Sequence, residues 1–481
     1  MLRLCKAVRE AGGRAMLVGG WVRDYLLGIE SKDFDIEVYG LDPARLRALL
    51  ETIAPVNTVG EHFAVYKLVF YSSDRDSSSE GSDSSSESNY KSEISNLKTR
   101  SSERFEIDVS LPRRESKSGR GHRAFIIEGD PQMTFEEAVR RRDFTINAIL
   151  YDPLADEIVD PFGGVEDLRR RILRAVAANT FIEDSLRVLR AVQLAARFEM
   201  TIDSQTVELC RSIDLSDLPH ERIWGEIEKL LMLAARPSIG LDAALRLGML
   251  DRLFPEIRAL VGCPQNPELH PEGDTFTHTK LALDEAVKLV GNLPKAKRIT
   301  AMLGALCHDL GKPLTTEMID GRIQSNGHEE AGVEPAIRVM ARLGLYTLAG
   351  YDVRSQVVAL VREHLKPREF YERHDRVTNG DFRRLARRVE IDLLYRVSKA
   401  CALGRGAASS STAEDWFIER ARALGVEHGP PEPLLLGRHL IEAGFQPGPR
   451  MGEILRHVYE LQLDDKVASL EEALAAARNF V

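Results

Sequence analysis

The sequence predicts an α+β protein, with a small mixed sheet and its helices first and helices from there onward. In residues 1–152, short apolar runs stand between helix-like segments, which is typical of strands and helices that share one domain. From Leu168 onward the pattern is helical. The length of 481 residues exceeds one ordinary domain, and a hydrophobic content of 43% suffices for several cores.

Charge and cysteine content indicate which partners and which cellular compartment to expect for this protein. The net charge of −9 argues against a protein that coats nucleic acid non-specifically, so RNA contacts need local basic patches. The five cysteines are scattered without a C-x-x-C pair, which indicates a reducing compartment. No signal-peptide pattern follows Met1, and no apolar run is long enough to span a membrane. We therefore expect a cytoplasmic protein without membrane contact, and the sequence implies no obligate protein partner.

The most informative stretch lies between Leu17 and Val38 and reads LVGGWVRDYLLGIESKDFDIEV. A short apolar strand ends at Gly19 and Gly20, and an amphipathic helix over Trp21–Leu27 follows. Two glycines at the mouth of a helix suit a phosphate group. Their backbone N–H groups allow close approach, and the helix N-terminus favours negative charge.

A second strand after this helix carries Asp33 and Asp35. Alternation along a strand turns these two carboxylates the same way, while Phe34 and Ile36 turn toward a core. Paired carboxylates repel each other, and Mg²⁺ held by carboxylates and substrate phosphates resolves that conflict. The stretch predicts a site for a metal-bound nucleoside triphosphate. The alternative is a plain glycine turn followed by a solvated strand end.

The glycine pair, Arg23-Asp24 and D-x-D together resemble the signature of the polymerase-β-like nucleotidyltransferases. The closer resemblance is to the branch of class II tRNA nucleotidyltransferases (CCA-adding) and bacterial poly(A) polymerases. It implies that Asp33 and Asp35 are catalytic and hold two Mg²⁺ ions. It also implies that Gly19, Gly20 and Arg23 contact the nucleotide.

Further strands are expected at His62–Tyr71 and Arg104–Ser110. Asp108 on the second of these is a candidate third catalytic carboxylate, and the alternative is an ordinary strand acid. Residues 72–103 between them are polar and of low complexity, so we expect a disordered insertion.

The segment FEEAVRRRDFTINAIL, Phe135–Leu150, carries a dense basic run. A basic run is usually a solvated face, but here it leads into polar residues flanked by apolar ones. The segment resembles the RRDFTxNA motif of the same family, which implies that Arg142, Asp143 and Asn147 contact the ribose and triphosphate.

The next motif lies in FIEDSLRVLRAVQLAARF, Phe181–Phe198, which we expect to be helical. Its charged residues, Glu183, Asp184, Arg187 and Arg190, recur at helical spacing, which also suits a simple ladder of ion pairs. The segment resembles the family's EDxxR motif, which implies base selection by Asp184 and Arg187 with Glu183 orienting them, and we expect Arg190 to be nucleotide-binding as well.

Base chemistry explains how one such pair selects two nucleotides. Cytosine and adenine both present an amino donor beside a ring-nitrogen acceptor. A carboxylate accepts from the amine while a guanidinium donates to the ring nitrogen. Guanine and uracil present the opposite polarity, so the pair admits CTP and ATP and rejects GTP and UTP without a template.

A second chemistry is expected between residues 270 and 365. Histidines on neighbouring helical segments flank a His-Asp dipeptide in LCHDLGKP, a pattern that fits ligation of a divalent transition metal by nitrogen and oxygen. The pattern resembles the HD phosphohydrolase superfamily. The candidate metal ligands are His278, His308, Asp309, His328 and His364.

One departure from the HD family concerns its final metal-binding Asp, which a late helix usually supplies. In this chain the corresponding SKACALGRG has Cys401. A thiolate is a softer ligand and suits Mg²⁺ or Mn²⁺ less well. The HD metal site is therefore either active or vestigial.

The expected domains are a nucleotidyltransferase head (1–152), a helical neck (153–262), an HD domain (263–405) and a helical tail (406–481) that contacts tRNA. The expected function is addition of CCA to the 3′ end of tRNA from CTP and ATP, with additional phosphohydrolase activity in the HD domain as a second expectation. The alternatives are a poly(A) polymerase, or an enzyme that adds only CC or only A.

Overall fold

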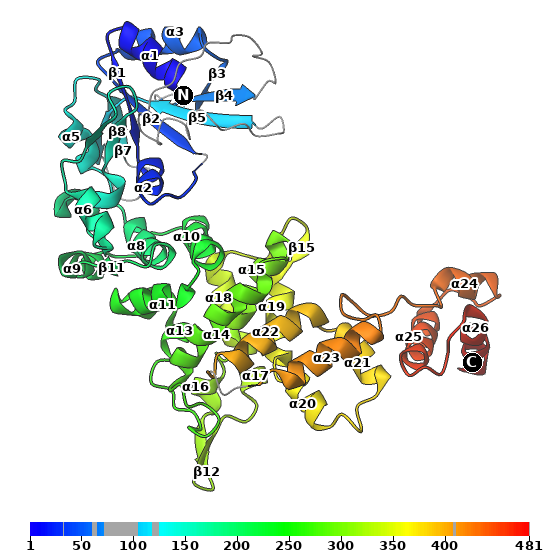
Figure 1. Ribbon diagram of the computed structural model, residues 1–481. Coiled ribbons are helices and arrows are strands. Elements are labelled where there is room, and N and C mark those ends of the chain that lie inside the picture. The colour runs from blue at the N-terminus through cyan, green and yellow to red at the C-terminus, as the bar shows by residue number, and fades with distance from the viewer. Residues whose placement is uncertain (32, 60–64, 72–103, 118–124, 407–409, 481) are drawn as a thin grey trace, which may run out of the picture. The chain divides into compact units, whose positions relative to one another are not determined.

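The computed structural model describes the chain except residues 32, 60–64, 72–103, 118–124, 407–409 and 481 (Figure 1). The predicted insertion at residues 72–103 lies outside this part of the chain. Two compact units are present. The first contains residues 1–187 and 201–212, and the second contains residues 188–200 and 213–481.

The first unit is built on a mixed seven-stranded sheet (Figure 1). Strands β2 and β5 pair in parallel and the other neighbours are antiparallel, which agrees with the small mixed sheet that the sequence predicts. In spatial order the strands are β3 (Val56–Val59), β4 (Val65–Tyr71), β5 (Arg104–Ser110), β2 (Phe34–Tyr39), β1 (Arg14–Val18), β8 (Leu150–Asp152) and β9 (Glu157–Val159).

Both faces of this sheet are covered. Helices α1 (Leu2–Glu10) and α3 (Pro43–Glu51) pack their apolar sides on one face, where Ile36 and Val38 of β2 are buried. On the other face, Tyr39 of β2 packs in a second apolar cluster with α5 (Phe135–Arg140). Strand β2 is therefore buried on both sides from Ile36 to Tyr39. Asp35 is exposed and lies at the edge of the core.

The remaining elements of the first unit are short. Helix α2 (Gly20–Leu26) begins one residue earlier than predicted, and the FEEAVRRRDFTINAIL segment contains a 3₁₀ turn, η1 (Thr145–Asn147), before β8 begins at Leu150. The others are α6 (Gly164–Arg169), α7 (Ala178–Phe181), α9 (Ser204–Ser212), the antiparallel pair β6 (Arg113–Lys117) and β7 (Phe125–Gly129), and the parallel pair β10 (Ile172–Leu173) and β11 (Thr201–Ile202).

The second unit is almost entirely helical, as predicted, and two small hairpins are its only strands among the described residues. Helix α8 (Leu186–Arg197) leads into it from the first unit. The hairpins are β12 (Glu317–Ile319) with β13 (Arg322–Gln324), and β14 (Thr347–Leu348) with β15 (Tyr351–Asp352). The helices are α10 (His220–Leu233), α11 (Pro237–Arg246), α12 (Met249–Leu253), α13 (Pro255–Arg258), α14 (Thr275–Val290), α15 (Lys295–Cys307), α16 (Lys312–Thr315), α17 (His328–Ala331), α18 (Val333–Leu343), α19 (Val353–Glu363), α20 (Lys366–Glu372), α21 (Asn379–Ala386), α22 (Ile391–Leu403), α23 (Thr412–Ala423), α24 (Gly437–Glu442), α25 (Pro449–Leu463) and α26 (Leu470–Phe480).

The last three helices share an apolar cluster that includes Leu440, Ile454 and Ala473. Arg384 of α21 joins them to the preceding helices through Glu460 at 2.9 Å and Asp464 at 2.6 Å. Among the described helices, none is both apolar and long enough to cross a bilayer.

Candidate nucleotide and metal sites

The glycine turn lies beside the second strand of the sheet. Gly19 has a φ of 73°, in the left-handed region that favours glycine. A Cβ placed on Gly19 would lie 3.0 Å from Nη1 of Arg142 and 3.5 Å from Oδ2 of Asp35. The backbone turn, the strand carboxylate and the arginine of the RRDFTIN segment therefore meet at one point, although they are far apart in the sequence.

The three predicted carboxylates lie at the same end of the sheet. Asp35 and Asp108 are register partners on the parallel strands β2 and β5, so their side chains share one face. Asp33 directly precedes β2, which begins at Phe34 rather than at the predicted first acid. Lys67 of β4 is the partner of Asp108 on the other side, and its Nζ lies 3.2 Å from Oδ1 of Asp108.

The charge around Asp35 is unbalanced toward the negative. Loss of hydration among the surrounding side chains raises the pKa of Asp35 above its ordinary value. The charges of Asp108, Asp33 and Glu37 act in the same direction, and Arg142 opposes them. A desolvated carboxylate with acidic neighbours fits a divalent cation, because the cation relieves the repulsion.

Glu37 is a site residue that sequence reasoning missed. It is 1% exposed in the middle of β2, where Oε1 accepts hydrogen bonds from Arg141 at 3.1 Å and Arg142 at 3.2 Å. Its other oxygen accepts from the hydroxyl of Tyr39 at 2.9 Å. Glu37 therefore fixes the arginine that reaches Gly19. The available signal was a third alternate acid in an otherwise apolar strand.

A buried polar network joins α2 to the RRDFTIN segment. Arg23 is 5% exposed, and its Nε and Nη2 donate to Asp24 Oδ1 at 2.8 and 2.6 Å. Nη1 of Arg23 donates to Asn147 Oδ1 at 2.8 Å, and Asn147 Nδ2 donates to Asp143 Oδ1 at 3.0 Å. Gly20 packs against this network, since a Cβ there would lie 3.3 Å from Nη2 of Arg23. These predicted site residues hold two elements together at the turn.

The EDxxR segment is not one continuous helix. The sequence predicted a helix from Phe181 to Phe198, but α7 ends at Phe181 and α8 begins at Leu186. Glu183 and Asp184 lie in the break, where Oδ1 of Asp184 accepts from the backbone N–H of Leu186 at 3.1 Å. An aspartate that satisfies a free N–H group at a helix start favours such a break.

Arg187 connects the start of α8 to the basic run. Its Nη1 donates to the carbonyl of Thr180 at 2.7 Å, and its Nη2 donates to the carbonyl of Arg141 at 2.5 Å. The guanidinium is therefore fixed next to the backbone of the RRD segment. Arg190 follows one turn later on α8.

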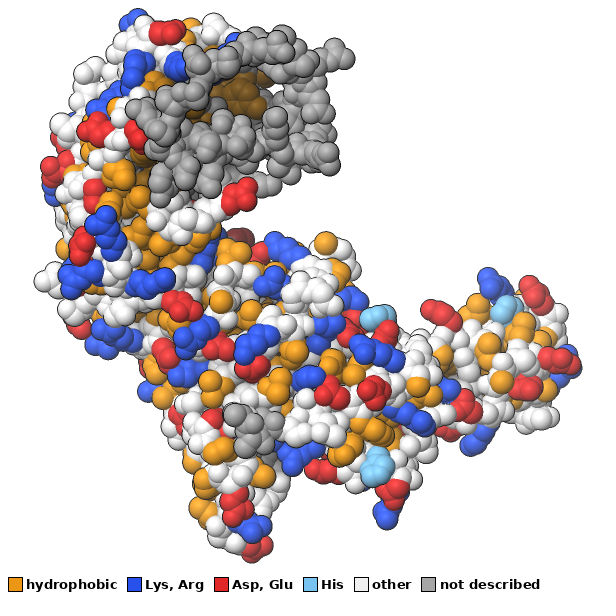
Figure 2. Space-filling model, in the orientation of Figure 1, with side chains coloured by type: hydrophobic (Ala, Val, Ile, Leu, Met, Phe, Trp, Pro, Cys, Tyr) orange, Lys and Arg blue, Asp and Glu red, His pale blue; other side chains and the backbone are white. Residues whose placement is uncertain are grey.

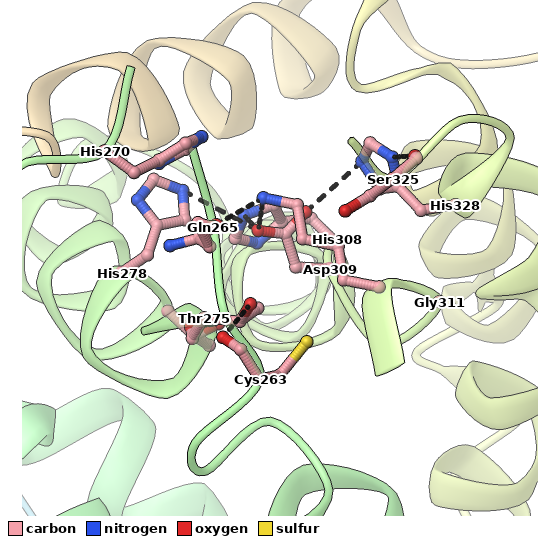
Figure 3. A network of polar contacts seen from close by, with 12 residues as sticks. Cys263, Gln265, His270, Thr275, His278, His308, Asp309, Gly311, Ser325 and His328 are labelled. Atoms are coloured by element: carbon pink, nitrogen blue, oxygen red, sulfur yellow. Dashed lines mark hydrogen bonds and ion pairs between the residues drawn. The ribbon is translucent and has the colours of Figure 1, made fainter. Parts of the chain in front are cut away.

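A second group of predicted residues meets in the second unit (Figure 3). Helix α14 supplies His278, the end of α15 supplies the His-Asp pair, α17 begins with His328, and His364 follows α19. All five side chains are buried, with residue exposures of 1–8%. The ligand-type atoms of Asp309, His328 and His364 lie within 4.8 Å of one another, as do those of His278, His308 and Cys401.

The two oxygens of Asp309 face different histidines. Oδ1 lies 3.4 Å from Nε2 of His328 and 3.9 Å from Nε2 of His364. Oδ2 lies 3.1 Å from Nε2 of His308 and 3.8 Å from Nε2 of His278. Lys312, a residue that sequence reasoning did not single out, places Nζ 2.8 Å from the same Oδ2.

Backbone carbonyls fix the tautomers of three histidines. Nδ1 of His308, His328 and His364 lies 2.7–2.8 Å from the carbonyl three residues earlier, and a carbonyl only accepts. Their Nε2 atoms are therefore left with lone pairs when the rings are neutral. Nε2 of His328 and Nε2 of His364 lie 3.2 Å apart, so two acceptors face each other. This arrangement fits a shared cation.

Burial supports the same conclusion. Among the described residues, buried His308 Nε2 has no hydrogen-bond partner, and buried Asp309 Oδ2 has the ion pair with Lys312 but no hydrogen bond of good geometry. Burial also lowers the pKa of His278 and of His364, which favours the neutral ring that a metal requires. The donor set of the HD cluster therefore fits a divalent metal.

The HD cluster lines a cavity of about 1120 Å³. Its wall carries both charges. Four basic side chains offer contacts to a phosphate group, namely Lys312, Arg322, Arg368 and Arg405, and six acidic ones line the same cavity.

Three family models match successive parts of the chain. The poly A polymerase head domain matches residues 15–174, the probable RNA and SrmB-binding site of polymerase A matches residues 199–260, and the HD domain matches residues 275–405. The order of these matches is the order of the motifs described above.

Similar proteins extend over nearly the whole chain. A multifunctional CCA protein of Xanthomonas campestris pv. campestris is 34% identical over 455 residues, which cover 91% of this chain and 95% of that protein. One from Haemophilus influenzae is 38% identical over 334 residues, covering 68% of this chain and 70% of that protein.

Solved structures share the fold. The Bacillus stearothermophilus CCA-adding enzyme in complex with CTP aligns with a TM-score of 0.62 at 21% identity, covering 100% of this chain and 96% of that one. The Thermotoga maritima CCA-adding enzyme complexed with tRNA aligns with a TM-score of 0.56 at 20% identity, covering 99% and 94%. From the length and identity of the sequence matches, together with the head and HD sites, the chain belongs to the family of multifunctional CCA proteins.

Proposed function

We propose that this chain adds C, C and A to the 3′ end of tRNA, from CTP and ATP and without a template. The observation that carries the proposal is the meeting of Gly19, Asp35 and Arg142, which places a phosphate-binding turn, a carboxylate and a cation together. Relatives named multifunctional CCA proteins, and structural neighbours solved with CTP or tRNA, support the same choice of substrates.

The carboxylates Asp33, Asp35 and Asp108 would hold two Mg²⁺ ions. Bound there, these ions supply positive charge to the attacking oxygen, the α-phosphate and the leaving pyrophosphate. In the reaction, the RNA 3′-oxygen loses its proton and forms a bond to the α-phosphorus, while the bond from that phosphorus to pyrophosphate breaks.

The chain's own groups bind and orient the nucleotide. Gly19 offers its backbone to the triphosphate, and Arg142 lies beside it with its guanidinium held by Glu37. Hydrogen bonds hold α2 against η1, and they connect Arg23 to Asn147 and Asn147 to Asp143. These positions pre-organise the charge that stabilises the transition state.

Asp184 and Arg187 would read the base, and Glu183 and Arg190 flank them. Arg187 is fixed by two backbone carbonyls, so its guanidinium has a defined direction before any nucleotide enters. The carboxylate accepts from the amino group of cytosine or adenine, and the guanidinium donates to the ring nitrogen.

We also propose phosphohydrolase activity in the HD domain, as a second function. It is supported by the buried cluster of Asp309 with four histidines and by the cavity that the cluster lines, whose wall includes four basic side chains. Here a divalent metal held by His278, His308, Asp309, His328 and His364 would activate water for attack on a phosphate ester.

We also propose four domains and a cytoplasmic location for the chain. We place the head at 1–152, the neck at 153–262, the HD domain at 263–405 and a tRNA-contacting tail at 406–481. Five buried free cysteines are compatible with a cytoplasmic location.

The test uses tRNA that ends at its discriminator base, with labelled CTP alone, ATP alone, or both. Full CCA addition predicts two C residues with CTP alone and a terminal A only when both are supplied. Incorporation of A without CTP would indicate an enzyme that adds only A. Incorporation of C but no A when both nucleotides are supplied would indicate one that adds only CC, and a long run of A would indicate a poly(A) polymerase.

A further inference from the structure

The HD cluster contains one residue that the rest of the cluster does not explain. Cys401 on α22 is 6% exposed, and it lies with His278 and His308 rather than with an apolar core. We propose that this chain has two unlike metal positions, and that the one formed by His278, His308 and Cys401 is a thiolate site for a borderline transition metal such as Zn²⁺. The inference rests on metal binding by the HD domain and is independent of nucleotide transfer.

The spacing of the three ligand atoms suits such an ion. Nitrogen and sulfur ligands of a tetrahedral zinc ion stand about 3.3–3.8 Å apart, given zinc–ligand bonds of about 2.0–2.3 Å. The nitrogen atoms of His278 and His308 and Sγ of Cys401 lie within 4.8 Å of one another. A closure of about 1 Å, within reach of side-chain rotation, would complete the site.

Asp309 links this position to a different one. Its Oδ2 faces His308 and His278, whereas its Oδ1 faces His328 and His364. The second position contains only nitrogen and oxygen ligands. The carboxylate of Asp309 thus connects a metal position with a thiolate ligand to a metal position with only nitrogen and oxygen ligands. The two positions favour different metals, because a thiolate is the softer ligand.

The surroundings of His278 strengthen the thiolate position. Its Nδ1 lies 2.7 Å from Oε1 of Glu272, whereas Nδ1 of His308 lies 2.8 Å from a backbone carbonyl. A carboxylate behind a histidine makes the ring a more basic ligand. Glu272 also lies 2.8 Å from Nδ1 of His270, and its second oxygen has no hydrogen-bond partner among the described residues.

A metal-free explanation competes with this one. His308 and Cys401 could instead contact only each other and Asp309, whose negative charge raises the pKa of His308 despite its burial, with no metal between them. A contact that excludes metal would give no sulfur-to-cobalt band. Cobalt therefore separates the two explanations.

The experiment uses Co²⁺ as the probe with the chelator-treated, full-length protein. Sulfur ligation gives a strong thiolate-to-cobalt charge-transfer band in the near ultraviolet, which nitrogen and oxygen ligands do not give. We expect the band in the wild type, its loss in Cys401→Ser, and its retention in the matched control Cys263→Ser. Cys263 is also buried, with Sγ 3.7 Å from the hydroxyl of Thr316, and it lies outside both ligand groups.

A second variant guards against misfolding. Cys401→Asp should bind Co²⁺ without the charge-transfer band, and it should shift the preference between Zn²⁺ and Mn²⁺ at least tenfold toward Mn²⁺ in metal-content measurements. Glu272→Gln should lower Co²⁺ affinity about 10–100-fold and keep the band.

Nucleotide incorporation and circular dichroism report whether each variant is folded. A band that persists in Cys401→Ser would overturn the inference. So would a wild type that binds Co²⁺ without the band, or one that binds no Co²⁺ at all.

Discussion

Single charged side chains at the head site determine how neighbouring side chains are oriented. Glu37 is the clearest case, because it is buried inside an apolar strand and yet bonds to two of the three arginines of the basic run. A buried carboxylate that is fully hydrogen-bonded is tolerated, and it holds each guanidinium in one orientation. The orientation of Arg142 beside Gly19 therefore depends on a residue that would not touch the nucleotide.

Replacing Glu37 by Gln should weaken nucleotide binding more than turnover. A hydrogen bond to a charged group contributes about 1.5–3 kcal/mol, so we expect KM for CTP to rise about tenfold or more, with a smaller change in kcat. Steady-state kinetics of CTP incorporation measure both values.

The matched control is Glu51→Gln, which removes an exposed ion pair with Arg47 at 2.8 Å. Such pairs contribute little, so its kinetics should stay at the wild-type level. An unchanged KM in Glu37→Gln would show that Arg142 needs no support from β2.

At the scale of elements, the turn between β1 and α2 has a defined requirement for glycine. Gly19 and Gly28 stand before and after α2 with similar φ values of 73° and 69°. A Cβ at Gly28 would meet nothing within 4 Å, whereas one at Gly19 would press on Arg142. Substitutions at Gly19 and Gly28 therefore distinguish two effects. Both strain the backbone, but only the one at Gly19 crowds the nucleotide site.

Both Gly19→Ala and Gly28→Ala should lose stability because both positions have positive φ, by about 1–3 kcal/mol each. Only Gly19→Ala should also lose CTP incorporation, by about tenfold or more, because it displaces Arg142. Thermal melting and the incorporation assay measure the two effects. Equal activity in both variants would remove the glycine turn from the site.

Two helices of the second unit are joined by a buried carboxylate. Glu256 of α13 accepts from Arg338 at 3.1 Å and from Arg342 at 2.8 Å, both on α18. Burial raises the pKa of Glu256, but the hydrogen bonds of these arginines outweigh it and hold the pKa below the ordinary value of 4.5. A lowered carboxyl pKa stabilises the fold above the ordinary value, and that stabilisation is lost as the pH falls below it.

Glu256→Gln should therefore lower stability by about 1–3 kcal/mol at pH 7. The difference from the wild type should shrink as the pH falls below 4.5, where the carboxylate of the unfolded chain also takes up protons. Thermal melting at several pH values measures this difference. A difference that stays constant with pH would contradict the assigned ion pairs.

At the scale of the whole molecule, the two proposed chemistries belong to separate compact units. The carboxylates and glycines of the head lie within residues 1–187, and the HD cluster lies within residues 213–481. Neither set of metal ligands includes a residue of the other unit, although Arg190 of the base-selecting segment belongs to the second unit. The two activities should therefore be separable by substitution.

We expect His308→Ala to abolish hydrolysis of a p-nitrophenyl phosphodiester while CCA addition stays within about twofold of wild type. Asp35→Asn should do the reverse. Parallel assays of both reactions on both variants measure this. Loss of both activities in either folded variant would contradict the separation.

Sequence reasoning succeeded where one short motif specifies its own structure. The strand, glycine turn, helix and D-x-D strand occur close to where LVGGWVRDYLLGIESKDFDIEV predicts them, and Ile36 and Val38 face the core. Reasoning failed where the partners are distant in sequence. Glu37 bonds to arginines 104 and 105 residues later, which no local pattern reveals. The break before α8 was missed because the helical spacing of the charges continues across it.

The most direct test of the central claim is Asp35→Asn in the full-length protein. The variant keeps the shape of the side chain and removes the charge that would hold Mg²⁺, so incorporation of labelled CTP into tRNA should fall about 10²–10³-fold or more. Melting should be unchanged or slightly raised, because the raised pKa of Asp35 means that its charge does not stabilise the fold. The matched control Glu30→Gln, an exposed acid before the same strand, should incorporate normally. Wild-type incorporation by a folded Asp35→Asn protein would contradict the account.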